Sequence, residues 1–196
     1  MAVSEVTICN KALGMLGANR ILSLSEDSRN ATLCNENYEI VRDGILEEYP
    51  WSFAKARISL AKDLTGPDFG YANSFTLPAD FLHVLEFNGD DSEYQVEGNK
   101  ILSDDGTCNL IYTKKVTDVG VFSKLFIVAF SARLAAELSI PVTNSKSTLE
   151  AMMGLYEDAL DRARKIDGRQ GRAKKFKSGK LTKPRHAGSI SVGPTV

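Results

Sequence analysis

The sequence predicts an α+β protein in which helices from both ends of the chain form one bundle, with a small β-sheet lobe inserted between them. Three observations predict this architecture. Apolar residues recur at helical spacing up to residue 48 and again from about residue 121. Between these segments apolar and polar residues alternate with the period of two that is typical of half-buried strands. Residues 168–196 contain few large apolar side chains, which predicts a flexible tail that cannot form a core by itself.

Two helices are expected at the start of the chain. Residues 4–16 follow a pattern of apolar residues three and four apart, with Ser4 as the candidate N-cap. Residues 26–48 repeat this pattern over a longer stretch, with Ser25 as the candidate cap and Pro50 just beyond the end. Each helix has one apolar stripe, so we expect the two helices to pack into a common core.

The middle of the chain predicts short strands. Gly98-Asn99 and Asp105-Gly106 are both typical of hairpin turns. The expected strands are residues 51–60, 74–77, 81–87, 94–96, 100–102 and 108–113.

Helical spacing returns near residue 121. The first of the two expected helices is apolar nearly all round, which predicts that it is buried, and it should stop at Pro141. The second covers residues 144–166 and begins either at Thr143 or at the capping box of residues 147–150.

The expected organisation places the N-terminal helices in residues 1–50 and the lobe in residues 51–118. The C-terminal helices take residues 119–167, and the basic extended tail takes residues 168–196. Trp51 follows the helix-ending proline and enters the lobe, so we expect it to pin the lobe to the bundle; the alternative is an exposed aromatic residue at a subunit interface. The predicted structural core includes Tyr38, Trp51, Phe53, Arg57, Phe126 and Leu134.

Charge is divided unevenly along the chain. Residues 1–161 hold 13 of the 24 Lys and Arg residues and 24 of the 25 Asp and Glu residues, a formal charge of −11. Residues 162–196 hold the rest, a formal charge of +10. This division predicts an acidic folded body and a basic arm with an acidic partner, either a nucleic acid backbone or an acidic protein surface. A tail that only improves solubility is the alternative.

The sequence gives little support to catalysis. Cys9, Cys34 and Cys108 form no metal-ligand spacing, and their odd number argues against a complete set of disulfides and for a reducing compartment. His83 lies in an expected strand and His186 in the tail, so neither is held beside a nucleophile. We therefore expect no enzyme activity, no metal and no cofactor. The longest purely apolar run has six residues, so no membrane span is expected, and synthesis in the cytoplasm is favoured.

The order and spacing of several short segments resemble the tail tubular protein A family, the head-to-tail adaptors of short-tailed phages. The segment Pro50-Trp51-Ser52-Phe53-Ala54-x-x-Arg57 is the most specific of them. That segment continues as Arg57-x-x-Leu60. The others are residues 10–17 (NKALGMLG), 21–31 (IxxLxEDSRNA), 41–46 (VRDxIL), 77–82 (LPADFL), 125–126 (LF), 133–138 (RLAAEL) and 141–143 (PVT). The resemblance covers most of residues 6–166 and does not extend to the tail.

The resemblance implies a structural virion protein at the head–tail interface. It implies a ring of about twelve copies that docks under the portal protein, receives a tail nozzle similar to tail tubular protein B and lets DNA pass through its lumen. It also implies that a C-terminal segment reaches along the portal. The candidate portal-binding residues are Arg169, Arg172, Lys174, Lys175, Phe176, Lys177, Lys180, Lys183 and Arg185.

Two other functions remain open from the sequence. The basic arm, with Phe176 among four basic residues, suits a nucleic-acid-binding protein. A hydrolase that acts on cell-wall or capsular glycan is the weaker alternative, because no carboxylate pair stands out among the 25 acidic residues.

Overall fold

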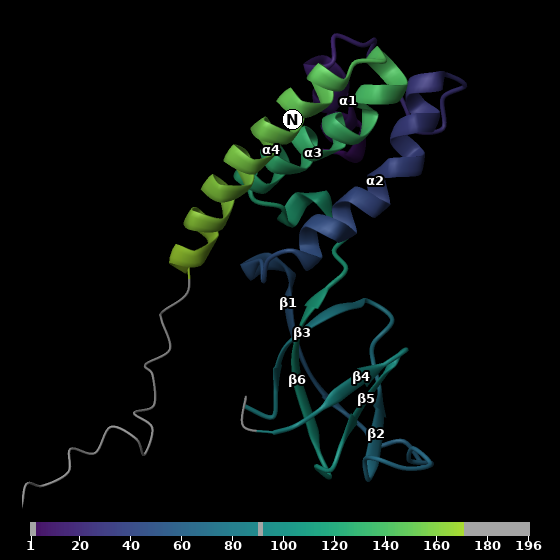
Figure 1. Cartoon of the computed structure of the whole chain (residues 1–196), viewed down its shortest axis with the longest axis vertical. Helices are drawn as coiled ribbons and strands as arrows, with labels where there is room; N and C mark the ends of the chain where they lie inside the picture. Colours follow the sequence, from purple (N-terminus) through teal and green to yellow (C-terminus); the bar gives the residue numbers. More distant parts are fainter. Residues whose placement is uncertain (1–2, 90–91, 171–196) are drawn as a thin grey trace, which may run out of the picture.

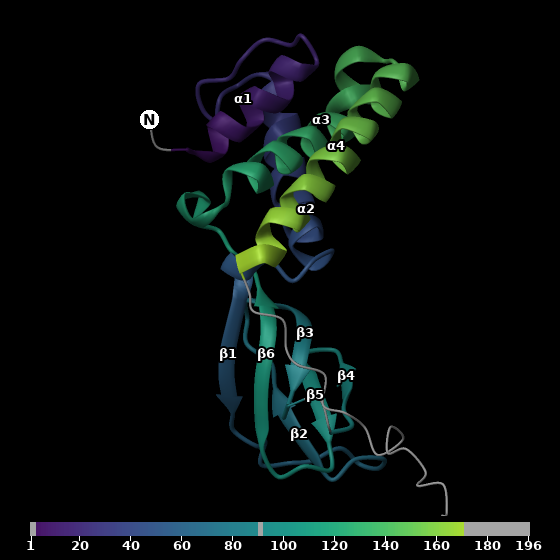
Figure 2. The ribbon, with the colours of Figure 1, turned by 90° about the vertical axis from the view of Figure 1, so that its left-hand side faces the viewer.

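The computed structural model describes residues 3–89 and 92–170 and has the expected α+β fold. A bundle of four helices lies at one end of an elongated molecule, and a β lobe lies at the other (Figure 1). The view turned by 90° shows the same end-to-end arrangement (Figure 2). The remaining residues, which include most of the basic tail, lie outside this description.

The first two helices are α1 (Glu5–Met15) and α2 (Arg29–Glu47). Ser4 caps α1 as expected, in a capping box with Thr7. The prediction that Ser25 caps α2 is wrong, because Ser28 is the N-cap and its hydroxyl accepts from the Ala31 N–H. The expected first turn is instead part of a loop, in which the Glu26 carboxylate accepts a hydrogen bond of 2.7 Å from the backbone N–H of Leu22. That bond also holds the pKa of Glu26 below its usual value.

The other two helices are α3 (Lys124–Thr143) and α4 (Lys146–Asp167). Pro141 does not stop α3, contrary to expectation; it lies within the last turn, and Asn144 ends the helix in a left-handed conformation with φ of 51°. A side chain from α2 holds this end in place, since Arg29 Nη2 donates to the Pro141 carbonyl at 2.6 Å. The N-cap of α4 is Ser145, so neither expected start is correct.

The lobe consists of two antiparallel sheets of three strands each. One sheet has the order β1-β6-β3 and the other β2-β5-β4. Their bounds are β1 (Lys55–Leu60), β2 (Asn73–Thr76), β3 (Phe81–Phe87), β4 (Gln95–Glu97), β5 (Lys100–Ser103) and β6 (Cys108–Lys114). Every expected strand is present, but the first starts late, because residues 52–54 form a 3-10 turn (Ser52–Ala54).

Only one of the two expected hairpin turns joins paired strands. Gly98, with φ of 58°, lies between β4 and β5, which pair antiparallel. The Asp105-Gly106 turn instead leads from β5 in one sheet to β6 in the other, so the prediction of a hairpin there is wrong. The two sheets enclose a small core that includes Phe75, Phe87 and Ile101.

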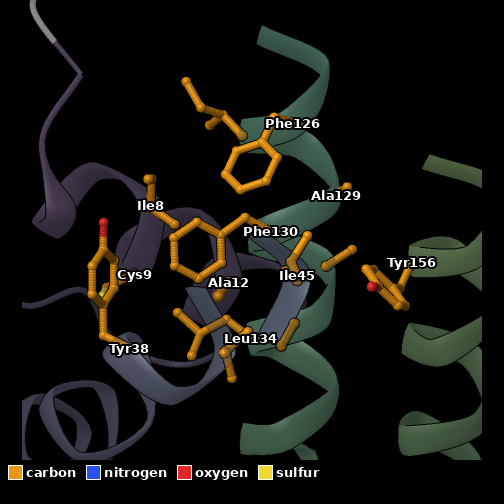
Figure 3. Packing of buried hydrophobic residues seen from close by; sticks show 14 of the residues in the cluster. Ile8, Cys9, Ala12, Tyr38, Ile45, Phe126, Ala129, Phe130, Leu134 and Tyr156 are labelled. Carbon is orange, nitrogen blue, oxygen red and sulfur yellow. The ribbon is translucent and has the colours of Figure 1, made fainter. Parts of the chain in front are cut away.

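The larger core lies in the bundle, where α3 packs against α1, α2 and α4 (Figure 3). By length and composition α3 could span a membrane, but most of it is buried inside the protein by the other helices. Tyr38, Trp51, Phe126 and Leu134 are buried in this core, while Phe53 is half-buried beside it. The prediction of Arg57 as a core residue is wrong, because this residue lies on the exposed edge strand β1.

Candidate partner-binding surfaces

Trp51 lies where the chain leaves the bundle for the lobe. Its side chain is fully buried, and its ring lies 5.0 Å from that of Phe126 and 5.9 Å from that of Phe53. The indole N–H donates to the Ile45 carbonyl at 2.9 Å. Ile45 is in the last turn of α2, where backbone carbonyls have no partner within the helix, so Trp51 both fills the core and caps α2.

A polar contact joins the same point to the end of α4. The Asp167 carboxylate accepts hydrogen bonds from the Ser52 backbone N–H at 2.9 Å and from the Ser52 hydroxyl at 2.6 Å. Close by, the Glu48 carboxylate accepts from the Tyr156 hydroxyl at 2.7 Å and pairs with Arg164 at 3.1 Å. Burial and the bond to Glu48 raise the pKa of Tyr156. These bonds fix the end of α4, and therefore the point from which the basic segment continues.

An ion network on α2 reaches the strand that returns from the lobe. Arg42 is 1% exposed, and its Nε bonds to Asp43 at 2.8 Å. Lys115, just after β6, lies 3.3 Å from the Asp43 carboxylate and 3.5 Å from that of Glu39. We call Trp51, the Ser52–Asp167 contact and this network the bundle–lobe joint. The sequence indicated Trp51 at this joint, but it did not reveal the other contacts, because they join distant parts of the chain.

The structure places one of the nine predicted portal-binding residues. Arg169 lies exposed in the short 3-10 turn Gly168–Gln170 that continues α4. The other eight, Arg172, Lys174, Lys175, Phe176, Lys177, Lys180, Lys183 and Arg185, lie outside the described residues.

The far end of the lobe carries a second candidate surface that the sequence reasoning missed. The loop of residues 61–72 follows β1, which runs away from the bundle (Figure 2). Leu64 is fully exposed in this loop, and Phe69 is 88% exposed. The sequence signal for this surface was the presence of large apolar residues in a loop rich in turn-forming residues. Because these residues are exposed, the loop is a candidate contact with another protein.

The described cysteine and histidine side chains do not come together in one site. All three thiols are buried. Burial raises the pKa of Cys108 to about 11. The pKa of Cys9 is also raised, first by its hydrogen bond to Cys34 and then by burial. His83 is exposed on β3 opposite Thr113. Within residues 3–89 and 92–170, no three His, Cys, Asp or Glu side chains are grouped so that they could hold a metal ion.

The acidic turns of the lobe have structural partners. Asp104 accepts from the Ala72 N–H at 2.9 Å, and Asp105 accepts from the Asn88 amide at 2.7 Å. These carboxylates order the loops at the far end of the lobe.

Comparison with known proteins adds no relative. No protein-family model matches the sequence, and no curated protein matches it.

Proposed function

We propose that the protein is a subunit of a head-to-tail adaptor ring, a non-catalytic virion component between the portal and the tail nozzle of a short-tailed phage. One observation carries this proposal. Several of the residues that resemble the tail tubular protein A family make contacts that hold the bundle and its joint to the lobe together. A likeness at such contacts supports a shared architecture more strongly than the same number of matches on the surface would.

Particular contacts illustrate this. The Asn10 side chain both donates to and accepts from the backbone of Ile21, each at 2.8 Å, and so ties the loop after α1 to that helix. Arg29 binds the carbonyl of Pro141, and Trp51 fills the bundle–lobe joint. Arg57 makes no such contact with the core: it belongs to the most specific segment but lies exposed on β1. Lys11, Asp27 and Glu137 of other segments are exposed as well.

The shape of the molecule also suits an adaptor. Its two ends differ: helices form one, and the loop with Leu64 and Phe69 forms the other (Figures 1 and 2). A ring of about twelve such subunits would present different surfaces to the portal and to the nozzle. The acidic lobe suits the lumen or the nozzle-facing side, because negative charge repels passing DNA and keeps it from binding there.

In this proposal the basic tail binds an acidic surface of the portal protein, with no metal or cofactor involved. Its origin beside Asp167 gives it a fixed starting point on the bundle. The protein would be made in the host cytoplasm and then act in the virion.

Two comparisons test the proposal. Particles assembled without the protein should leak DNA and be non-infectious; sealed and infectious particles would overturn it. In addition, a chain that ends at residue 170 should keep the melting temperature of the full chain but lose binding to the portal of the same virus, and unchanged binding would refute the role of the tail.

The basic tail also favours the second candidate, a nucleic-acid-binding protein. That function predicts a shift of duplex DNA in gels that weakens steeply with salt and disappears with the chain that ends at residue 170. The adaptor proposal predicts no stable complex of this kind.

A further inference from the structure

A row of exposed residues on α2 forms the first part of the inference. Ile40 is 74% exposed in the middle of the helix. Glu36, Ile40 and Gly44 are four residues apart, so they lie along one side of the helix, and the exposed Glu47 continues that side. We call these four residues the α2 ridge.

No contact among the described residues explains Gly44. A Cβ at this position would meet no atom within 4 Å, so the fold leaves room for a larger residue. Glycine inside a helix is less stable than alanine, so the residue carries a cost that the described chain does not require. The close approach of another molecule to the helix backbone would give glycine a physical reason here.

An apolar groove lies on another side of the bundle, between α1, α3 and α4. Its volume is about 360 Å³. The apolar residues that line it are Met15, Leu125, Val128, Ala132, Leu155 and Ala159. We call this surface the helix groove.

The border of the helix groove is more basic than acidic. Arg162 and Asp158 both line it and are exposed. Lys11 and Lys124 are exposed one turn before Met15 and Val128, on the sides of α1 and α3 that carry those lining residues. Three basic side chains thus border the groove against two acidic ones, Asp158 and the exposed Asp161 that follows it by three residues on α4. The ridge carries two acidic side chains and no basic one.

We propose that the α2 ridge of one copy docks into the helix groove of a second copy of this chain. Ile40 enters the apolar groove, Glu36 and Glu47 meet its basic border, and Gly44 allows the neighbouring helices to approach. The opposite charges set the register of the two copies.

The arrangement of the helices suits repetition of this contact. The groove is lined by α4 and not by α2, and α3 separates these two helices (Figure 1). The contact therefore joins two different surfaces of the same bundle, and such a heterologous contact forms a closed ring when its rotation closes. The inference rests on the proposed function, since it supplies the contact between neighbouring subunits of the adaptor ring.

Cysteine cross-linking of the full chain tests the contact. Two single variants, Ile40→Cys and Ala159→Cys, are oxidised separately and as a mixture; Cys9, Cys34 and Cys108 are buried and do not compete. The mixture should give a disulfide-linked dimer that neither variant gives alone. The double variant should give a ladder of larger species, because each copy then carries both halves of the contact. The control is a mixture of Leu64→Cys with Ala159→Cys, because Leu64 is also exposed but lies in the lobe loop, away from the proposed contact.

A mixture that gives no more dimer than the control overturns the proposal. Gly44→Ala, introduced into the Ile40→Cys variant, distinguishes an effect on the contact between copies from an effect on the stability of the fold. It should raise the melting temperature by about 2–4 °C and lower the dimer yield at least about fivefold, because the added methyl group crowds the contact. An unchanged yield would overturn the role given to Gly44. The adaptor function has an independent test in the particles that lack the protein, so failure of the cross-link alone rejects this contact and not the function.

Discussion

Replacing Trp51 by alanine tests how the bundle and the lobe are held together. The side chain is fully buried against Phe53 and Phe126, and truncation of such a residue costs about 3–5 kcal/mol. The change also leaves the buried carbonyl of Ile45 without its donor, which adds about 1–3 kcal/mol. We expect the free energy of unfolding to fall by at least about 4 kcal/mol.

Urea unfolding followed by circular dichroism is the suitable measurement, because Trp51 is the only tryptophan and fluorescence cannot follow the variant. Trp51→Phe is the matched control: it keeps a buried ring but loses the N–H donor, so about 1–3 kcal/mol should be lost. If the alanine variant loses less than about 1 kcal/mol, Trp51 does not hold the joint and the reasoning is refuted.

Three further changes examine other contacts. Asp167→Ala leaves the Ser52 backbone N–H without its acceptor, while the Ser52 hydroxyl keeps a second acceptor in Gln170 Oε1 at 3.1 Å. The change should lower the free energy of unfolding by about 1.5–3 kcal/mol in urea, and a neutral result would mean that this contact contributes nothing. The hydrogen bond from Lys100 is the main cause that holds the pKa of Asp63 below its ordinary value of 3.8. The ionised Asp63 carboxylate therefore stabilises the fold above that pH, and this stabilisation is lost as the pH falls through the lower pKa of the folded state. Asp63→Asn should therefore flatten the acid end of the melting-temperature profile in calorimetry, and an unaltered profile would contradict this. Phe69→Ser should change the free energy of unfolding by less than about 0.5 kcal/mol, whereas a clear loss would show that the loop is packed.

Helical periodicity predicted the four helices because each buries a stripe or, in α3, nearly its whole surface. Their ends were harder to predict, since they depend on contacts between segments. Ser25 and Ser28 are both good caps, and the bond between Glu26 and the Leu22 N–H decides between them. Pro141 looked like a terminator, because proline lacks the N–H that would bind the carbonyl four residues earlier. The helix nevertheless continues to Thr143, and Arg29 binds the Pro141 carbonyl in this last turn.

The candidate surfaces were predicted less well than the fold. The contact between Ser52 and Asp167 joins residues 115 positions apart, and no local pattern in the sequence pairs them. Arg57 was predicted as a core residue, but β1 is an edge strand and Arg57 lies exposed on it. Ile40 could have been found from the sequence, because it falls outside the apolar stripe that Cys34, Tyr38 and Val41 define on α2.

The chain enters the lobe through β1 and leaves it through β6, and these strands are paired from Lys55 with Thr113 onward. If the lobe were removed, the two chain ends left on the bundle would therefore be close neighbours. The bundle core is formed by α1 to α4 and by residues at the joint such as Trp51 and Val116. We therefore expect that a few linking residues could replace the lobe, or that a different sheet could be inserted there, while the bundle keeps its fold. The sheet end of the protein could then vary while the helical end keeps its packing.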